Sequence, residues 1–130
     1  MNAKSCLTII LASLALSACT YGAERERKPV APAATVIGEA VSCIPITQIR
    51  ETRIRDDWTI DFIGNGSQVW RNTLPGRCSG LRSENKFSYE TSLSQLCSTD
   101  IIHVLHQYGN SIQKGAGCGL GQFVPVKLEK

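Results

Sequence analysis

Apolar and polar residues alternate over several short stretches of the chain, which is the pattern of half-buried β-strands. In the stretch WTIDFI, Trp58, Ile60 and Phe62 fall on one face, whereas Thr59 and Asp61 fall on the other. We therefore predict a strand with one face in the core and a polar face open to solvent.

A turn signal follows this strand directly. Asn65-Gly66 is the residue pair that favours a type I′ turn, because both central positions of that turn need positive φ. Alternation then resumes around Val69 in the stretch QVWRN. We predict a β-hairpin across Asn65-Gly66.

The other strands are predicted from shorter signals. Residues 46–55 mix β-branched with charged residues, and residues 86–90 alternate between apolar and polar residues. Residues 100–106 are dense in β-branched side chains. Apolar residues from Leu93 to Tyr108 also follow helical spacing. The alternative is therefore a short helix before or within the last of these stretches.

The end of the chain completes the predicted fold. The glycine-rich residues 109–121 are typical of turns and bulges, and residues 122–128 predict a last strand in which Pro125 suits an edge position. The predicted fold class is mainly β: a small antiparallel β-sheet domain, arranged as a meander or like a sandwich or barrel, with one short helix as an option.

The first residues of the chain form an export signal. Lys4 supplies a positive charge, and the apolar run that ends at Leu16 is shorter than the roughly 20 apolar residues of a membrane span. Ser17 and Ala18 then lead directly into Cys19. This Leu-Ser-Ala-Cys sequence resembles the lipobox of bacterial lipoproteins, in which the cysteine thiol takes a diacylglycerol and the new amine is acylated.

The resemblance implies three acyl chains on Cys19, and two membrane-binding signals already anchor a protein stably. We predict a signal peptide at residues 1–18, a lipidated flexible tether at residues 19–40 and a folded domain at residues 41–130. Thr20 stands where an Asp would resemble a signal for inner-membrane retention, so we expect the outer membrane. A secreted protein with Cys19 in a disulfide is the alternative.

Cysteine usage supports export independently. Of the six cysteines, Cys6 leaves with the signal peptide and Cys19 is taken by lipid. The remaining cysteines form an even set without CxxC spacing, which predicts a disulfide framework in a small exported domain. They are Cys43, Cys78, Cys97 and Cys118.

Four cysteines allow three connectivities, and the sequence leaves all of them open. We favour Cys78 with Cys97, which closes the nearest loop, and Cys43 with Cys118, which ties the ends of the domain together. In the chain-entropy model each bridge stabilises the fold by roughly 3 to 4.5 kcal/mol.

Few polar groups are candidates for chemistry. His103 and His106 would lie on opposite faces of a strand, and Asp100 is the only carboxylate close to them in sequence, so we expect no metal site there. The acidic group in residues 56–61 could bind Ca²⁺, but a polar turn and the solvent-facing side of a strand explain it. That group consists of Asp56, Asp57 and Asp61.

Composition and motifs exclude other function classes. The net charge of +3 is too close to neutral to favour nucleic-acid binding. The chain has neither a dinucleotide fingerprint nor a G-x-S-x-G elbow. We therefore expect no catalytic residue, no cofactor and no enzymatic activity.

The cysteine and turn motifs carry a family resemblance. RCSGL, LCSTD and GCGLGQFVPV, set after DDWTIDFIGNG, resemble a family of small proteobacterial envelope proteins of unknown function, over roughly residues 41–128. The resemblance implies an exported, disulfide-stabilised domain, and it implies no reaction, cofactor or catalytic residue.

These observations predict a lipoprotein of the outer membrane that faces the periplasm and acts as a binding or structural module. Its expected contacts are the membrane, through the anchor, and an envelope protein, peptidoglycan or lipopolysaccharide, through exposed arginine and aromatic side chains. The alternative is a small periplasmic enzyme or a ligand- or metal-binding protein that uses His103, His106 and Asp100. Convergence of these three side chains in one cleft would favour the alternative.

Overall fold

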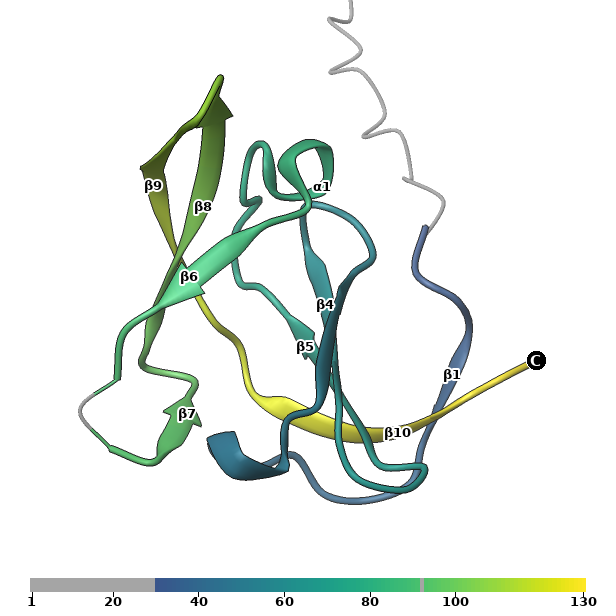
Figure 1. Cartoon of the computed structure of the whole chain (residues 1–130). Helices are drawn as coiled ribbons and strands as arrows, with labels where there is room; N and C mark the ends of the chain where they lie inside the picture. Colours follow the sequence, from purple (N-terminus) through teal and green to yellow (C-terminus); the bar gives the residue numbers. More distant parts are fainter. Residues whose placement is uncertain (1–29, 92) are drawn as a thin grey trace, which may run out of the picture.

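The computed structural model describes residues 30–91 and 93–130 (Figure 1). The predicted signal peptide, the predicted lipidation site Cys19 and the first part of the predicted tether lie outside them. Antiparallel strands dominate the described part of the chain, which confirms the mainly β fold class. The elements are β1 Ala34–Val36, β2 Cys43–Pro45, a 3-10 turn η1 Ile46–Gln48, β3 Glu51–Ile54, β4 Thr59–Ile63, β5 Val69–Thr73, α1 Leu81–Glu84, β6 Phe87–Tyr89, β7 Gln95–Cys97, β8 Ile101–Tyr108, β9 Ser111–Gly119 and β10 Phe123–Leu128.

The strands form one five-stranded sheet and two smaller ones. The five-stranded sheet has the order β1-β10-β5-β4-β3, β6-β8-β9 form a second sheet, and β2 pairs with β7. Strands β4 and β5 are antiparallel neighbours, which confirms the hairpin predicted between them.

The turn of that hairpin differs from the predicted type I′ turn. The Gln68 N–H donates to the Asn65 carbonyl at 3.3 Å, so the central residues of the turn are Gly66 and Ser67. Of these two residues only Gly66 has positive φ, at 65°. Because a type I′ turn needs positive φ at both central positions, the predicted turn type is wrong.

The core lies between the five-stranded sheet and the sheet β6-β8-β9. Ile60 and Phe62 are fully buried there, as predicted. Phe62 meets Phe123 of β10 edge-on at a centroid distance of 5.4 Å, and it meets Phe87 of β6 at 6.4 Å. Edge-to-face contacts of this kind add to the energy of burial, so these rings hold the two sheets together.

The hairpin β8–β9 both confirms and corrects the sequence-based prediction. Residues 100–106 fall largely in β8, so the predicted strand is confirmed and its helical alternative is wrong. Residues 109–121, predicted as turns and bulges, contain the nine-residue strand β9, although a register shift interrupts its pairing with β8. Gly109, with a φ of 59°, allows a two-residue turn with Asn110 and so lets β9 return along β8.

Strand β10 lies between β1 and β5, so the edge position predicted for Pro125 is wrong. The Ile37 N–H donates to the Pro125 carbonyl at 3.0 Å. Proline has no N–H with which to return this hydrogen bond, and β1 ends at Val36. Pro125 therefore ends the pairing with β1 within the sheet.

Strand β1 also corrects the predicted domain boundary. Its residues fall within the predicted tether, residues 19–40, yet Ala34 lies opposite Leu128 and Val36 lies opposite Val126 of β10. The folded domain thus begins before residue 41. A strand of only three residues gives too weak a pattern to stand out from a Pro- and Ala-rich linker.

The four cysteines among the described residues form two disulfides, as predicted, but the favoured pairing is wrong. The bridges join Cys43 to Cys97 and Cys78 to Cys118. Cys43 lies directly opposite Cys97 in the pair β2–β7, with the Cα atoms 4.0 Å apart. Strands β2 and β7 are far apart in sequence, so an argument from loop length could not find their pairing.

Candidate functional site

Asp61 is the centre of a buried charge cluster on the face of β4 that points away from the aromatic core. Its side chain is 0% exposed, so the prediction of a solvent-facing Asp61 is wrong. Oδ1 accepts a hydrogen bond from Arg71 Nε at 2.8 Å, and Oδ2 accepts bonds from Arg55 Nε at 2.8 Å and Arg71 Nη2 at 3.0 Å. We call these three residues the Asp61 cluster.

The segment before β1 is bonded to the Asp61 cluster. Arg71 Nη1 donates to the Pro32 carbonyl at 2.8 Å. Burial alone would raise the pKa of Asp61, but the hydrogen bonds from Arg71 and Arg55 outweigh it and hold the pKa below the ordinary value. The carboxylate is therefore ionised at neutral pH, and its role is to join strands and the amino-terminal segment.

The other two aspartates of the predicted acidic group are engaged separately. Asp56 Oδ1 accepts the Trp58 N–H at 2.8 Å. Asp57 Oδ1 accepts the Arg82 N–H at 2.9 Å, and its Oδ2 accepts a hydrogen bond from Arg77 at 3.0 Å. Within the described residues, no group of three or more His, Cys, Asp or Glu side chains could hold a metal ion.

The two histidines lie three residues apart on β8, so their side chains point to opposite faces of the strand. His103 Nδ1 lies 3.4 Å from the Gly115 carbonyl of β9. His106 Nδ1 lies 3.1 Å from Glu84 Oε1 of α1. The two imidazoles therefore have separate partners.

Two glycines of β9 make room for these rings. A Cβ on Gly115 would lie 2.3 Å from His106 Nε2, and a Cβ on Gly117 would lie 3.2 Å from His103 Cε1. Gly115 and Gly117 thus have a packing role, because a Cβ would crowd His106 at the first position, and Ile101 Cγ2 at 2.9 Å and His103 at the second.

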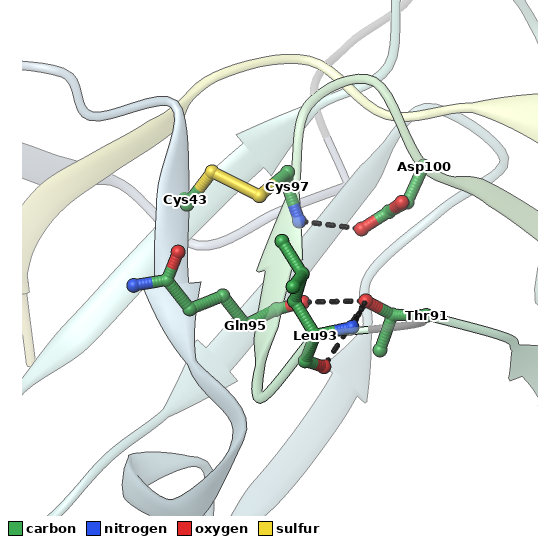
Figure 2. Close-up of a disulfide and its surroundings, with 6 residues drawn as sticks. All are labelled: Cys43, Thr91, Leu93, Gln95, Cys97 and Asp100. Carbon is green, nitrogen blue, oxygen red and sulfur yellow. Dashed lines mark hydrogen bonds between the residues drawn. A yellow bond between two sulfur atoms is a disulfide. The ribbon is translucent and has the colours of Figure 1, made fainter.

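Asp100 has a structural partner of its own beside the Cys43–Cys97 disulfide (Figure 2). Its Oδ2 accepts the Cys97 N–H at 2.7 Å. In the segment before β7, Thr91 Oγ1 donates to the Gln95 carbonyl at 2.8 Å. These bonds fix the chain around the disulfide, and they leave Asp100 apart from the histidine partners described above.

A serine lies across from one histidine without being activated by it. Ser88 of β6 is directly opposite His103 in the strand register. Within the described part of the chain, the buried Ser88 Oγ has no hydrogen-bond partner. A nucleophilic serine is activated by a hydrogen-bonded base, and no hydrogen bond joins Ser88 Oγ to His103.

The predicted contact surface of arginine and aromatic side chains is only partly present. Arg55 and Arg71 belong to the Asp61 cluster, and Trp70 is 9% exposed in the core. The large exposed apolar side chains of the described residues are spread over several segments, among them Val36, Ile37, Leu93 and, on the hairpin β8–β9, Ile101, Tyr108 and Ile112. On that hairpin they form no single patch, since Ile101 and Ile112 lie near opposite ends and Tyr108 points to the other face from Ile112. The Gly-Asn turn signal at residues 109–110 could have revealed this hairpin from sequence.

Comparisons with known proteins do not indicate a function for this chain. A scan against protein-family models found no match, and searches of the curated proteins and of the solved structures found none either. Across residues 30–91 and 93–130, no helix is long and apolar enough to span a membrane.

Proposed function

We propose that this chain is a lipid-anchored protein of the bacterial outer membrane, and that its β domain faces the periplasm as a binding or structural module. The anchor would be Cys19, behind the signal sequence that ends in Leu-Ser-Ala. The membrane would be one partner, and an envelope protein, peptidoglycan or lipopolysaccharide would be the other.

The observation that carries this proposal is how the cysteines are used. All four cysteines of the domain are paired in disulfides, which persist in an oxidising compartment such as the periplasm. Once Cys6 leaves with the signal peptide, Cys19 remains without a partner in an even framework. A lipid-modified Cys19 accounts for the odd cysteine.

The arrangement of polar groups supports a module over an enzyme. His103, His106 and Asp100 bind three different partners, which are the Gly115 carbonyl, Glu84 and the Cys97 N–H. Catalysis by acid, base or metal needs such groups to converge on one reacting atom. Exposed apolar side chains on several segments, among them Val36, Ile37 and Ile112, are available for contacts of such a module.

Replacement of the anchor cysteine tests the proposal. The Cys19→Ser protein should lose palmitate labelling and leave the outer-membrane fraction, whereas the matched variant Cys6→Ser should retain both properties. Continued labelling of the Cys19→Ser protein would overturn the anchor. Crosslinking of intact cells, followed by capture of the lipidated protein, should yield an envelope component that the Cys19→Ser protein captures far less.

A further inference from the structure

The turn between β4 and β5 carries an Asn-Gly pair at the surface. Asn65, Gly66 and Ser67 are all exposed. Across the turn, the Gln68 N–H donates to the Asn65 carbonyl at 3.3 Å, which is a long hydrogen bond. Within the described residues, neither the Asn65 side-chain amide nor the Gly66 N–H takes part in a hydrogen bond. No hydrogen bond therefore has to break before these two groups can meet.

Asn65 and Gly66 can close a five-membered ring. Once hydroxide has taken the Gly66 N–H proton, the backbone nitrogen attacks the carbonyl carbon of the Asn65 side chain. A bond forms between these two atoms, the bond from that carbon to the side-chain nitrogen breaks, and the nitrogen takes a proton from water and leaves as ammonia. Water then opens the cyclic imide at either carbonyl, which yields aspartate or isoaspartate at position 65. The sequence of steps consumes one water molecule and needs no oxidant or reductant.

The residue after Asn65 leaves room for this ring. Glycine has no Cβ, so its backbone nitrogen can come close to the neighbouring side chain. Even a Cβ built on Gly66 would meet no atom within 4 Å, so the rest of the fold leaves position 66 open to water. The reaction therefore meets no steric obstacle from other elements.

The other asparagines of the described chain are less suited to this reaction. Asn72 is fully buried, and its side chain donates to the Gly121 carbonyl and accepts the Gly121 N–H. Asn85 and Asn110 are exposed, but the residue that follows each of them carries a Cβ, which hinders the approach of the attacking nitrogen. Among these residues Asn65 is the one best placed to react.

We propose that Asn65 is a site of spontaneous deamidation, and that the reaction alters the β4–β5 hairpin as the protein ages. Isoaspartate continues the chain through its side-chain carbon, so it adds one atom to the backbone of a turn whose length fixes the register of the strands. Gly64, next to the turn, is packed against Trp70, where a Cβ would lie 2.7 Å from the ring. The added atom should disturb this packing. The modification goes beyond the proposed function and does not depend on the lipid anchor.

Incubation of the purified, disulfide-bonded protein at mildly alkaline pH tests the proposal. Peptide mass spectrometry should show conversion at Asn65 at a rate that rises with hydroxide concentration. In water enriched in heavy oxygen, the product should carry the isotope at position 65. Asn110 should convert at least about tenfold more slowly, and Asn72 should stay unmodified. An Asn65 that stays unmodified in the folded protein would overturn the proposal.

Two variants separate the ring closure from its consequence. Gly66→Ala keeps Asn65 but adds a Cβ to the attacking residue, so conversion should fall at least about tenfold. Equal conversion in Gly66→Ala would overturn the ring mechanism. Asn65→Asp supplies the new charge without the added backbone atom, so the converted protein should melt at a lower temperature than Asn65→Asp. Equal melting temperatures would overturn the proposed change in the hairpin, and a non-reducing peptide map confirms that each protein keeps both disulfides.

Discussion

Asp61 and Arg71 lie directly opposite each other on β4 and β5, and the buried carboxylate accepts two hydrogen bonds from the guanidinium group. Arg71 also holds the Pro32 carbonyl. One side chain therefore joins two neighbouring strands to the segment that leads into β1. Because the carboxylate has no contact with solvent, stability should respond strongly to any loss of its charge.

Replacement of Asp61 by Asn should destabilise the domain. The variant leaves Arg55 and Arg71 without their shared counter-charge, and loss of one partner from a buried ion pair costs about 3 kcal/mol. Urea unfolding measures the change in free energy. The control Glu51→Gln removes a carboxylate from an exposed pair of the same sheet, and an equally stable Asp61→Asn protein would show that the cluster has no such role.

Acid should unfold the protein partly by protonating Asp61. Burial would raise its pKa, but the arginine hydrogen bonds lower it below the ordinary value, so the native state favours the ionised form. A lowered native pKa stabilises the fold above the unfolded-state pKa of about 3.9, and this contribution is lost as pH falls through the native pKa. Thermal melts from neutral to acidic pH should therefore show a shallower pH dependence for Asp61→Asn than for the unmodified protein.

The burial of Asp61 also shows why sequence pattern found the strand but not its environment. Alternation predicts which residues share a face of β4, and Ile60 and Phe62 are in the core as expected. The pattern does not say what covers the other face. There Arg55 and Arg71 bind Asp61, and Arg71 is bonded in turn to Pro32, which is far away in sequence and lies in a stretch predicted as tether.

The disulfide pairing can be checked through single cysteine substitutions. Cys43→Ala should leave a free thiol at Cys97, and Cys78→Ala should leave one at Cys118. Loss of either bridge should lower the free energy of unfolding by about 4 kcal/mol, because both bridges close long loops. Alkylation without reduction and mass spectrometry identify the thiol. A free Cys118 in the Cys43→Ala protein would restore the pairing first favoured from sequence.

Gly121 should tolerate no side chain. A Cβ at this position would lie 2.1 Å from the Thr73 carbonyl, and the backbone of Gly121 exchanges two hydrogen bonds with the buried Asn72 side chain. Gly121→Ala should therefore cost about 3 kcal/mol, at the upper end for overpacking. Gly119→Ala is the matched control, since a Cβ there meets no atom within 4 Å. Thermal denaturation should separate the two variants, and equal melting temperatures would contradict the close approach.

Turn sequences explain why the β4–β5 hairpin could be predicted and the β8–β9 hairpin could not. Asn65-Gly66 correctly marked the β4–β5 hairpin, although the turn itself is centred one residue later. Gly109-Asn110 is an equally informative turn signal. The glycines that follow it, however, predict turns and bulges where the strand β9 lies. Two of those glycines, Gly115 and Gly117, lie against His106 and against Ile101 and His103, and these contacts between strands can be seen only in the folded chain.

The last prediction concerns those histidines. Substitution of both His103 and His106 by Gln should leave the fold and any envelope phenotype of the gene unchanged, because each ring has a separate structural partner and no shared reacting atom. A modest loss of stability is expected, since His106 contacts Glu84 of α1. Glu84→Gln is the matched variant, because it weakens the same contact while both imidazoles remain.

Complementation of a deletion strain, with circular dichroism as the check on folding, decides between the two function classes. If the histidines only support the structure, the double variant and Glu84→Gln should complement equally well. A double variant that folds but fails to complement, beside a Glu84→Gln protein that succeeds, would mean that the imidazoles themselves act on a ligand or substrate. The chain would then be an enzyme or a ligand-binding protein, and the proposed module would be wrong.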